Sequence, residues 1–256
     1  MSTYMWSHIR MIEEAYSVYQ IPSSTTIKQE AKKQTAGTLA KHGTDHAEAF
    51  VEFSKRIPGY TSNLCVDDQI TLVKGASIEA MLLRASHFYQ ENKFALNRRL
   101  DSTDIRHAAK QKMKAFFQKV RNYELDTTQF SLLQSLVLMS PDREMLKNKS
   151  IVSKLRFQNA EALRLYSRYQ RFGKEDLNES QWPRERVNKH TAVAMAKLIE
   201  ILTDLRSLKV IYQELLFERR LEDLTPLLCE IWDLNPLKCI DRPKVSSKIE
   251  RARQNF

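Results

Sequence analysis

Arg84 is the side chain in this sequence with the most demanding chemistry. It follows an apolar run that covers nearly all sides of a predicted helix, which therefore lies inside the protein; the run contains Ile70, Leu72, Val73, Ile78, Met81, Leu82 and Leu83. A guanidinium cannot be neutralised, so a buried Arg84 needs an anionic or strongly accepting partner. Two interpretations stay open: an internal ion pair, for instance with Glu79 or a main-chain cluster, and a contact with the polar end of a hydrophobic ligand.

The sequence gives little support for a metal site or a catalytic nucleophile. His42 and His46 are four residues apart, but Gly43 stands where the protease pattern H-E-x-x-H has glutamate, and no third ligand is evident. The three cysteines lack C-x-x-C spacing, which disfavours a zinc module and a disulfide framework. Because no phosphate-binding glycine loop or nucleophile motif is present either, we expect neither an enzyme nor a metal protein.

A short helix is predicted at residues 224–234. Thr225 is a good N-cap, Pro226 occupies the first helical position, and Asn235 and Pro236 close the segment. Its apolar residues flank Glu230, a carboxylate that a buried helix face would not carry alone; they are Leu227, Leu228, Ile231 and Trp232.

The elements that position these residues are helices. Gly 5 and Pro 7 are low counts for 256 residues, and no sustained alternating pattern predicts a sheet. We expect helices at 3–20, from a cap at Thr44 or Asp45 to Ile57, from Asp67 and Asp68 to about 91, at 104–122, 125–139 and 151–172, and a long one at 186–218. Residues 21–38 are predicted as a loop or weak helix, and 92–103 as a short hairpin.

The net charge of +10 invites a nucleic-acid interpretation, but the basic residues are spread over amphipathic helices and a basic tail. No apolar run reaches the ~18 residues that cross a membrane. The start of the chain shows no secretory signal, so we expect an intracellular protein.

Three stretches carry a family resemblance. They are F-x-x-F-S-K-R-I-P-G-Y from Phe50, D-D-Q-I-T-L-V-K-G from Asp67, and I-E-A-M-L-L-R from Ile78. Together they resemble the signature of nuclear receptor ligand-binding domains, and residues 227–232 resemble the activation helix of that family. T-D-L-R-S-L at 203–208 and S-P-D-R at 140–143 are similar to the vitamin D receptor-like branch, and most of all to the nematode dauer-formation receptors for dafachronic acids.

The resemblance implies a three-layer antiparallel helical sandwich of about 11–12 helices with one short β-hairpin. Residues 1–234 would form the ligand-binding domain and 235–256 a basic C-terminal extension. It further implies a nuclear protein that contacts DNA only through a zinc module absent from this chain, so that the sequence is a domain cut from a longer protein.

The resemblance also implies a ligand site without metal or cofactor. The ligand would be a steroid acid similar to dafachronic acid, with Arg84 at its polar end and further contacts from His46, Tyr212, Met81 and Phe88. Glu79 and Arg143 resemble the buried ion pair of receptors that heterodimerise.

The implied partners are a coactivator carrying an LxxLL motif and a second receptor. A helical peptide has a positive N-terminus and a negative C-terminus; by resemblance Glu230 would hold the first end and Lys55 the second, with Lys74 adding to the second site and Leu227 and Ile231 lining the groove. The helix at 186–218 would mediate homo- or heterodimerisation. The alternative is a constitutive, ligand-independent coactivator or corepressor module.

Overall fold

The computed structural model describes residues 2–19, 36–87, 104–173, 184–217 and 225–232, and within these ranges all secondary structure is helical. The helices are α1 (Thr3–Val18), α3 (Ala36–Arg56), α4 (Tyr60–Asn63), α5 (Val66–His87), α6 (Asp104–Asn122), α7 (Thr127–Leu138), α8 (Lys149–Phe172), α9 (Arg184–Phe217) and α10 (Pro226–Ile231). This confirms the all-α class. The hairpin predicted at 92–103, the end of the helix predicted to 91, and the basic extension at 235–256 lie outside the described residues.

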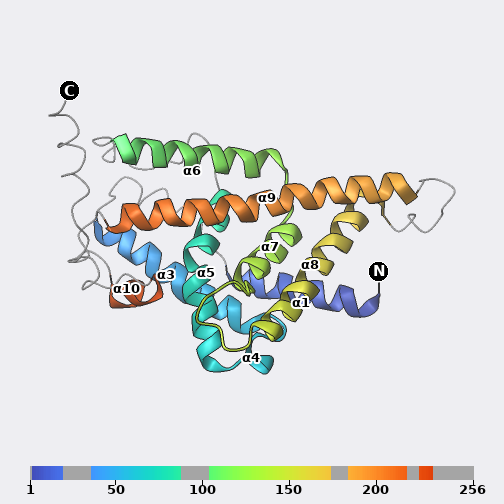
Figure 1. Cartoon of the computed structure of the whole chain (residues 1–256), viewed down its shortest axis with the longest axis horizontal. Coiled ribbons are helices and arrows are strands. Elements are labelled where there is room, and N and C mark those ends of the chain that lie inside the picture. Colours follow the sequence, from blue (N-terminus) through green and yellow to red (C-terminus); the bar gives the residue numbers. More distant parts are fainter. Residues whose placement is uncertain (1, 20–35, 88–103, 174–183, 218–224, 233–256) are drawn as a thin grey trace.

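The helices are arranged around a central pair, α5 and α7. On one side of this pair lie α1 and α3, which pack against each other and against α7 and α5 respectively; on the other side lie α6 and α9 (Figure 1). The helix α8 packs against α7 and α9, and the short α10 packs against α3 and α5. The result is a helical sandwich in which the middle layer is shielded on both faces.

Burial of the central pair follows from its sequence. In α7 every side chain from Thr128 to Leu138 is buried, and α5 is buried along most of its length. The two helices are joined by a hydrogen bond of 2.9 Å from Gln134 Nε2 to the Ala80 carbonyl. A polar side chain in such a core is stable only when it finds such a partner. This packing fixes the position of Arg84, one turn further along α5.

Several helix ends lie where local chemistry predicts them. Asp126 accepts a bond of 2.8 Å from the backbone N–H of Gln129, whose side chain accepts one of 3.1 Å from the N–H of Asp126, so α7 starts with a capping box. Gly173 ends α8 with a φ of 72°, a left-handed value that glycine adopts without strain. Pro58 and Gly59 separate α3 from α4.

Two predicted caps are wrong. The helix α3 begins at Ala36, so Thr44 and Asp45 lie inside it rather than at its start. The side chain of Asp68 accepts hydrogen bonds from the backbone N–H groups of Lys147, at 2.7 Å, and Asn148, at 3.1 Å, just before α8. Those amides lack partners within their own helix, and the buried carboxylate satisfies them instead of the first turn of α5.

The helix α9 has 34 residues and runs along the length of the molecule (Figure 1). Its inner side chains Leu198, Ile201, Leu205 and Leu208 belong to the core. Ile199 and Val210 are exposed; they are eleven residues apart, about three turns, and so share a face. The chain as described thus leaves a strip of α9 exposed, with Ile199 and Val210 at its two ends and the polar Thr203 between them. None of the described helices is long and apolar enough to cross a membrane.

Candidate functional site

Arg84 is buried in the middle layer, with 2% of its surface exposed. Its Cζ atom lies 3.8 Å from the ring centroid of Tyr19, so the guanidinium rests on the face of an aromatic ring. Within the described part of the chain, Nε and Nη2 have no hydrogen-bond partner. Burial lowers the pKa of Arg84 from its usual value, and the neighbouring phenols of Tyr19 and Tyr16 oppose that shift. Two buried guanidinium nitrogens without hydrogen-bond partners form an unusual and costly arrangement.

Glu79 is not the partner of Arg84. Its two carboxylate oxygens accept hydrogen bonds of 3.1 and 3.0 Å from Nη1 and Nη2 of Arg143, with the two side chains only 2% and 9% exposed. Arg206 and Lys209 approach Glu79 at 3.5 and 4.0 Å. The predicted buried pair of Glu79 with Arg143 is therefore confirmed, and an ion pair of Glu79 with Arg84 is wrong.

His46 connects Arg84 to the far side of the site through Tyr19. The hydroxyl of Tyr19 lies 3.1 Å from Nδ1 and 3.2 Å from Nε2 of His46, and Nε2 also lies 3.3 Å from the carbonyl oxygen of Ser77. Burial and the charge of Arg84 lower the pKa of His46 to about 3, so the ring is neutral at physiological pH. A carbonyl can only accept, so Nε2 carries the proton and Nδ1 accepts from Tyr19.

Tyr16 completes the aromatic surroundings of Arg84. Its hydroxyl lies 3.1 Å from Nδ1 of His87, and the imidazole of His87 stacks on Phe130 with ring centroids 4.0 Å apart. Burial raises the pKa of Tyr16 to about 12, which keeps the phenol neutral. Sequence reasoning missed the roles of Tyr16, in α1, and of Tyr19, the residue that ends it, because nothing in the helix predicted at 3–20 shows which of its side chains meet Arg84.

Trp232, at the C-terminal end of α10, joins this cluster to the short helix. Its indole Nε1 donates a hydrogen bond of 3.3 Å to Oγ of Ser77, and its ring meets Tyr212 edge-on with centroids 6.3 Å apart. The predicted ligand residues Arg84, His46 and Tyr212 are thus linked through one chain of contacts. Of the other two, Met81 is partly buried against the core and Phe88 lies outside the described residues.

The helix α10 is docked by its apolar face and by its first residue. Leu228 and Ile231 are buried against α3 and α5. Oγ1 of Thr225 caps the N–H of Leu228 at 3.4 Å and lies 2.9 Å from Oγ1 of Thr44, so the predicted cap also ties α10 to α3. Gly43 permits this approach: a Cβ added there would lie 2.8 Å from Cδ1 of Leu228.

The charged residues of the predicted clamp lie at the surface. Glu230 makes an ion pair of 3.2 Å with Lys74, and Lys55 makes one of 2.6 Å with Glu52 on its own helix. Ile70, predicted as part of an all-round buried helix, is 47% exposed, one turn before Lys74. The start of α5 therefore has an open apolar side that the sequence pattern did not predict.

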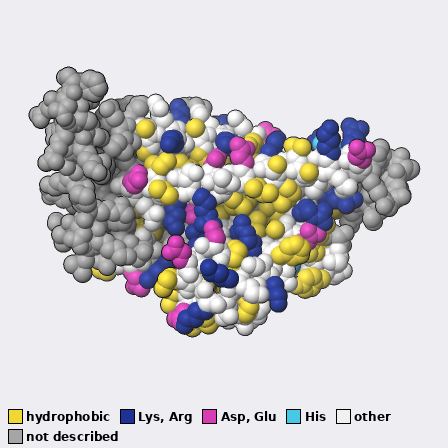
Figure 2. Space-filling model, viewed as in Figure 1, with side chains coloured by type: hydrophobic (Ala, Val, Ile, Leu, Met, Phe, Trp, Pro, Cys, Tyr) yellow, Lys and Arg dark blue, Asp and Glu magenta, His cyan; other side chains and the backbone are white. Residues whose placement is uncertain are grey.

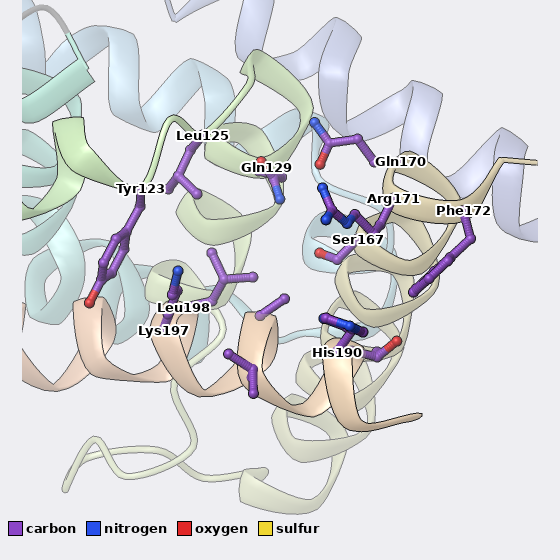
Figure 3. A pocket seen from close by; sticks show the side chains of 13 residues that line it. Tyr123, Leu125, Gln129, Ser167, Gln170, Arg171, Phe172, His190, Lys197 and Leu198 are labelled. Atoms are coloured by element: carbon purple, nitrogen blue, oxygen red, sulfur yellow. The ribbon is translucent and has the colours of Figure 1, made fainter. Parts of the chain in front are cut away.

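A separate hollow of about 250 Å³ lies between the ends of α6, α7, α8 and α9. Figure 3 shows Ser167, Arg171 and Phe172 entering from α8, and His190, Lys197 and Leu198 entering from α9. None of the predicted ligand residues lines it. It is a partly open surface hollow, distinct from the cluster around Arg84.

With the geometry in place, comparison with known proteins decides the family. Residues 26–220 match the family model described as the ligand-binding domain of nuclear hormone receptor. The chain belongs to this family. The chain is also 29% identical over 218 residues to the ecdysone receptor of Lucilia cuprina, an alignment that covers 79% of this chain and 26% of that receptor. The chain thus spans about a quarter of the length of the relative it matches.

Membership of the nuclear receptor family agrees with the fold and with the expectation that the chain is not an enzyme. Proteins of this family are ligand-regulated transcription factors. On the face drawn in Figure 2, Lys and Arg side chains are scattered over several helices with Asp and Glu among them. That distribution fits a solvated surface better than a single nucleic-acid-binding face.

Proposed function

We propose that this nuclear receptor domain binds a steroid acid similar to a dafachronic acid and that the bound ligand favours docking of α10, which recruits an LxxLL coactivator. The observation that carries the proposal is the buried Arg84 with two guanidinium nitrogens that lack partners. These are Nε and Nη2, which lie on one edge of the guanidinium. Arg164 uses the same two atoms to bind both oxygens of Glu161, at 2.8 and 2.6 Å.

This edge suits a carboxylate better than a ketone. Two parallel N–H groups match two carboxylate oxygens, and such charge-assisted bidentate bonds are about twice as strong as neutral ones. A ketone oxygen would satisfy fewer of these donors. The neutral imidazole of His46 and the phenol of Tyr19 add polar groups beside the charge without adding a competing anion. We therefore assign the acid end of the ligand to Arg84.

Replacing Arg84 with methionine is expected to weaken binding of dafachronic acid by about 10- to 100-fold, because a hydrogen bond to a charged group contributes about 1.5–3 kcal/mol. Displacement of a labelled steroid measures this. The methyl ester of the same acid is the matched control: it should bind the methionine variant and the unchanged protein with similar affinity. Equal loss for acid and ester would make Arg84 a structural residue.

The proposed coactivator groove is bounded by three helices. On α3 the partly buried Val51 lies one turn before Lys55, and on α5 the exposed Ile70 lies one turn before Lys74. On α10 the partly buried Leu227 precedes Glu230 by three residues. Each helix thus offers an apolar side chain beside a charge, which is what a short helix with apolar anchors and charged ends requires. Ile231, being buried, serves the docking of α10 in this proposal.

Replacing Glu230 with alanine is expected to reduce affinity for an LxxLL peptide by at least about tenfold, since a carboxylate that holds the peptide's N-terminal N–H groups is lost. Affinity for dafachronic acid should not change. Fluorescence anisotropy of a labelled peptide measures the effect, and Glu144→Ala, at an exposed carboxylate before α8, is the control. Retained peptide binding would remove Glu230 from the clamp.

The second candidate function is a constitutive interaction module, in which the docking of α10 against α3 and α5 would not depend on a ligand. Peptide anisotropy with and without dafachronic acid separates the two. A severalfold gain in peptide affinity supports a ligand-gated domain, and equal affinity supports the constitutive module.

We further propose that the exposed strip of α9, with Ile199 and Val210, contacts a second receptor domain in a homo- or heterodimer, and that the protein acts in the nucleus. Sedimentation of the chain at increasing concentration tests the homodimer.

A further inference from the structure

Ser77 contacts both His46, in the polar cluster around Arg84, and Trp232, at the end of α10. It lies in the middle of α5 with 0% of its surface exposed. Its carbonyl oxygen lies 3.3 Å from Nε2 of His46, and its hydroxyl oxygen accepts a bond of 3.3 Å from Nε1 of Trp232. We propose that Ser77 is a positioning residue that couples the polar cluster around Arg84 to the docking of α10. This inference rests on the proposed function and adds the residue through which its two sites communicate.

The hydroxyl of Ser77 differs from those of four other buried serines in the described helices; a fifth, Ser167 on α8, has no hydrogen-bond partner. Serines in helices usually donate to a carbonyl of the preceding turn. Four others here do so, in bonds of 2.6 to 2.8 Å: Ser54, Ser86, Ser131 and Ser135. The bond that Ser77 makes with its hydroxyl goes to another element, 155 residues away. The side chain is therefore used for tertiary positioning and not for local helix geometry.

The bond matters because its donor, the indole N–H of Trp232, cannot form a hydrogen bond with water while α10 is docked. Trp232 is almost completely buried, and an indole N–H is a donor only. Without the Ser77 hydroxyl this N–H would stay unpaired in the core whenever α10 is docked, and the unpaired state is avoided only by undocking. Undocking exposes Leu228, Ile231 and Trp232, and the loss of one hydrogen bond to a buried donor changes that equilibrium by about tenfold. A single hydrogen bond can thus shift the docking equilibrium appreciably.

The second part of the proposed coupling links Ser77, on α5, to Arg84. Nε2 of His46 donates to the Ser77 carbonyl, and Nδ1 accepts from Tyr19, whose ring carries the Arg84 guanidinium. A group that binds Arg84 orders Tyr19 and His46, and these hold the backbone of Ser77. The same residue then presents its hydroxyl to Trp232. Coupling between two sites is reciprocal, so a docked α10 also favours the ordered cluster.

Hydrogen exchange of the amides in residues 227–232 tests the inference without any ligand. Ser77→Ala is expected to speed their exchange by about tenfold, the loss for an unpaired buried donor. Ser86→Ala, on the same helix and equally buried but locally bonded, is the control and should leave α10 exchange unchanged. A general change across all helices would indicate lost stability, and an unchanged α10 would overturn the inference.

A double-mutant cycle separates this bond from a merely structural role. Trp232→Phe keeps an aromatic ring but removes the donor, so adding Ser77→Ala to it should change α10 exchange by no more than about twofold. Fully additive effects would overturn the link between the two residues. His46→Phe keeps the ring stacked near Phe50 without its nitrogens and is expected to speed α10 exchange severalfold; no effect would overturn the coupling to the ligand cluster.

The proposed function is tested by a different measurement on the same variants. Dafachronic acid should slow α10 exchange in the unchanged protein, and by a smaller factor in Ser77→Ala. If the acid has no effect on the unchanged protein, the steroid-acid proposal fails, while the exchange rates of the three single variants and the cycle still decide the role of Ser77.

Discussion

Replacing Glu79 with alanine is expected to lower the free energy of unfolding by about 3–5 kcal/mol, the loss typical when one partner of a buried ion pair is removed. Arg143 would keep its charge at 9% exposure with no carboxylate beside it, and Arg206 and Lys209 would add two further cations at the same place. For a chain of this size about 1 kcal/mol corresponds to roughly 2–4 °C in melting temperature, so a fall of about 6–20 °C is expected.

Thermal unfolding followed by circular dichroism measures this change. Glu161→Ala is the matched control, because Glu161 also pairs bidentately with an arginine, at 2.8 and 2.6 Å, but on the partly exposed surface of α8. Partly exposed pairs contribute at most about 1 kcal/mol, so the control should melt within a few degrees of the unchanged protein. Equal shifts for the two variants would mean that burial does not set the contribution of the Glu79 pair.

The parts of the structure that the sequence predicted well are those governed by local chemistry. Thr225 and Pro226 start α10 by the short-range rule that predicted them. The long apolar run of α5 predicted a buried helix because no other environment accepts it. Such features depend on neighbours in the sequence, and the sequence displays them directly.

The errors concern partners that are far apart in the chain. Asp68 resembles an N-cap of its own helix, yet it satisfies the amides of Lys147 and Asn148, about 80 residues later. Thr44 resembles a cap as well, and in the fold it meets Thr225. In both cases a side chain that is able to cap finds a tertiary partner, and no spacing rule predicts which one.

In the functional site, too, local features were predicted and long-range contacts were not. Arg84 was singled out because burial and permanent charge conflict in any fold, and the structure bears out its burial. The aromatic ring beneath it comes from Tyr19, in a helix 65 residues earlier, and the link to α10 comes from Ser77, whose side chain gives no sign in the sequence of contacting Trp232. A charged residue in an apolar helix can be recognised from the sequence around it, whereas the residues that contact its charge are known only from the fold.

Replacing Gly43 with leucine is expected to displace α10 while leaving the rest of the fold intact. A Cβ at this position would lie 2.8 Å from Cδ1 of Leu228 and 3.0 Å from Cη2 of Trp232, and the other three side-chain carbons of leucine would extend further into the same space. Overpacking of this kind costs about 1–3 kcal/mol, and since α10 has six residues, undocking relieves it at the least loss of contact. Affinity for an LxxLL peptide should fall by roughly 5- to 150-fold.

The melting temperature should change less than the peptide affinity, because a gain in α3 offsets part of the loss of α10 docking. Leucine stabilises a helix interior by up to ~1 kcal/mol relative to glycine, so α3 itself gains when Gly43 is replaced. The measurements are peptide anisotropy, hydrogen exchange of residues 227–232 and the melting temperature, with Glu48→Leu on the exposed side of α3 as the control for an added leucine. A Gly43→Leu protein that binds peptide as tightly as the unchanged chain, with α10 still protected, would show that α10 does not need this close approach to α3. Lost peptide binding with an unchanged melting temperature would instead show that docking of α10 is a local equilibrium, separate from the stability of the domain and open to control by a ligand.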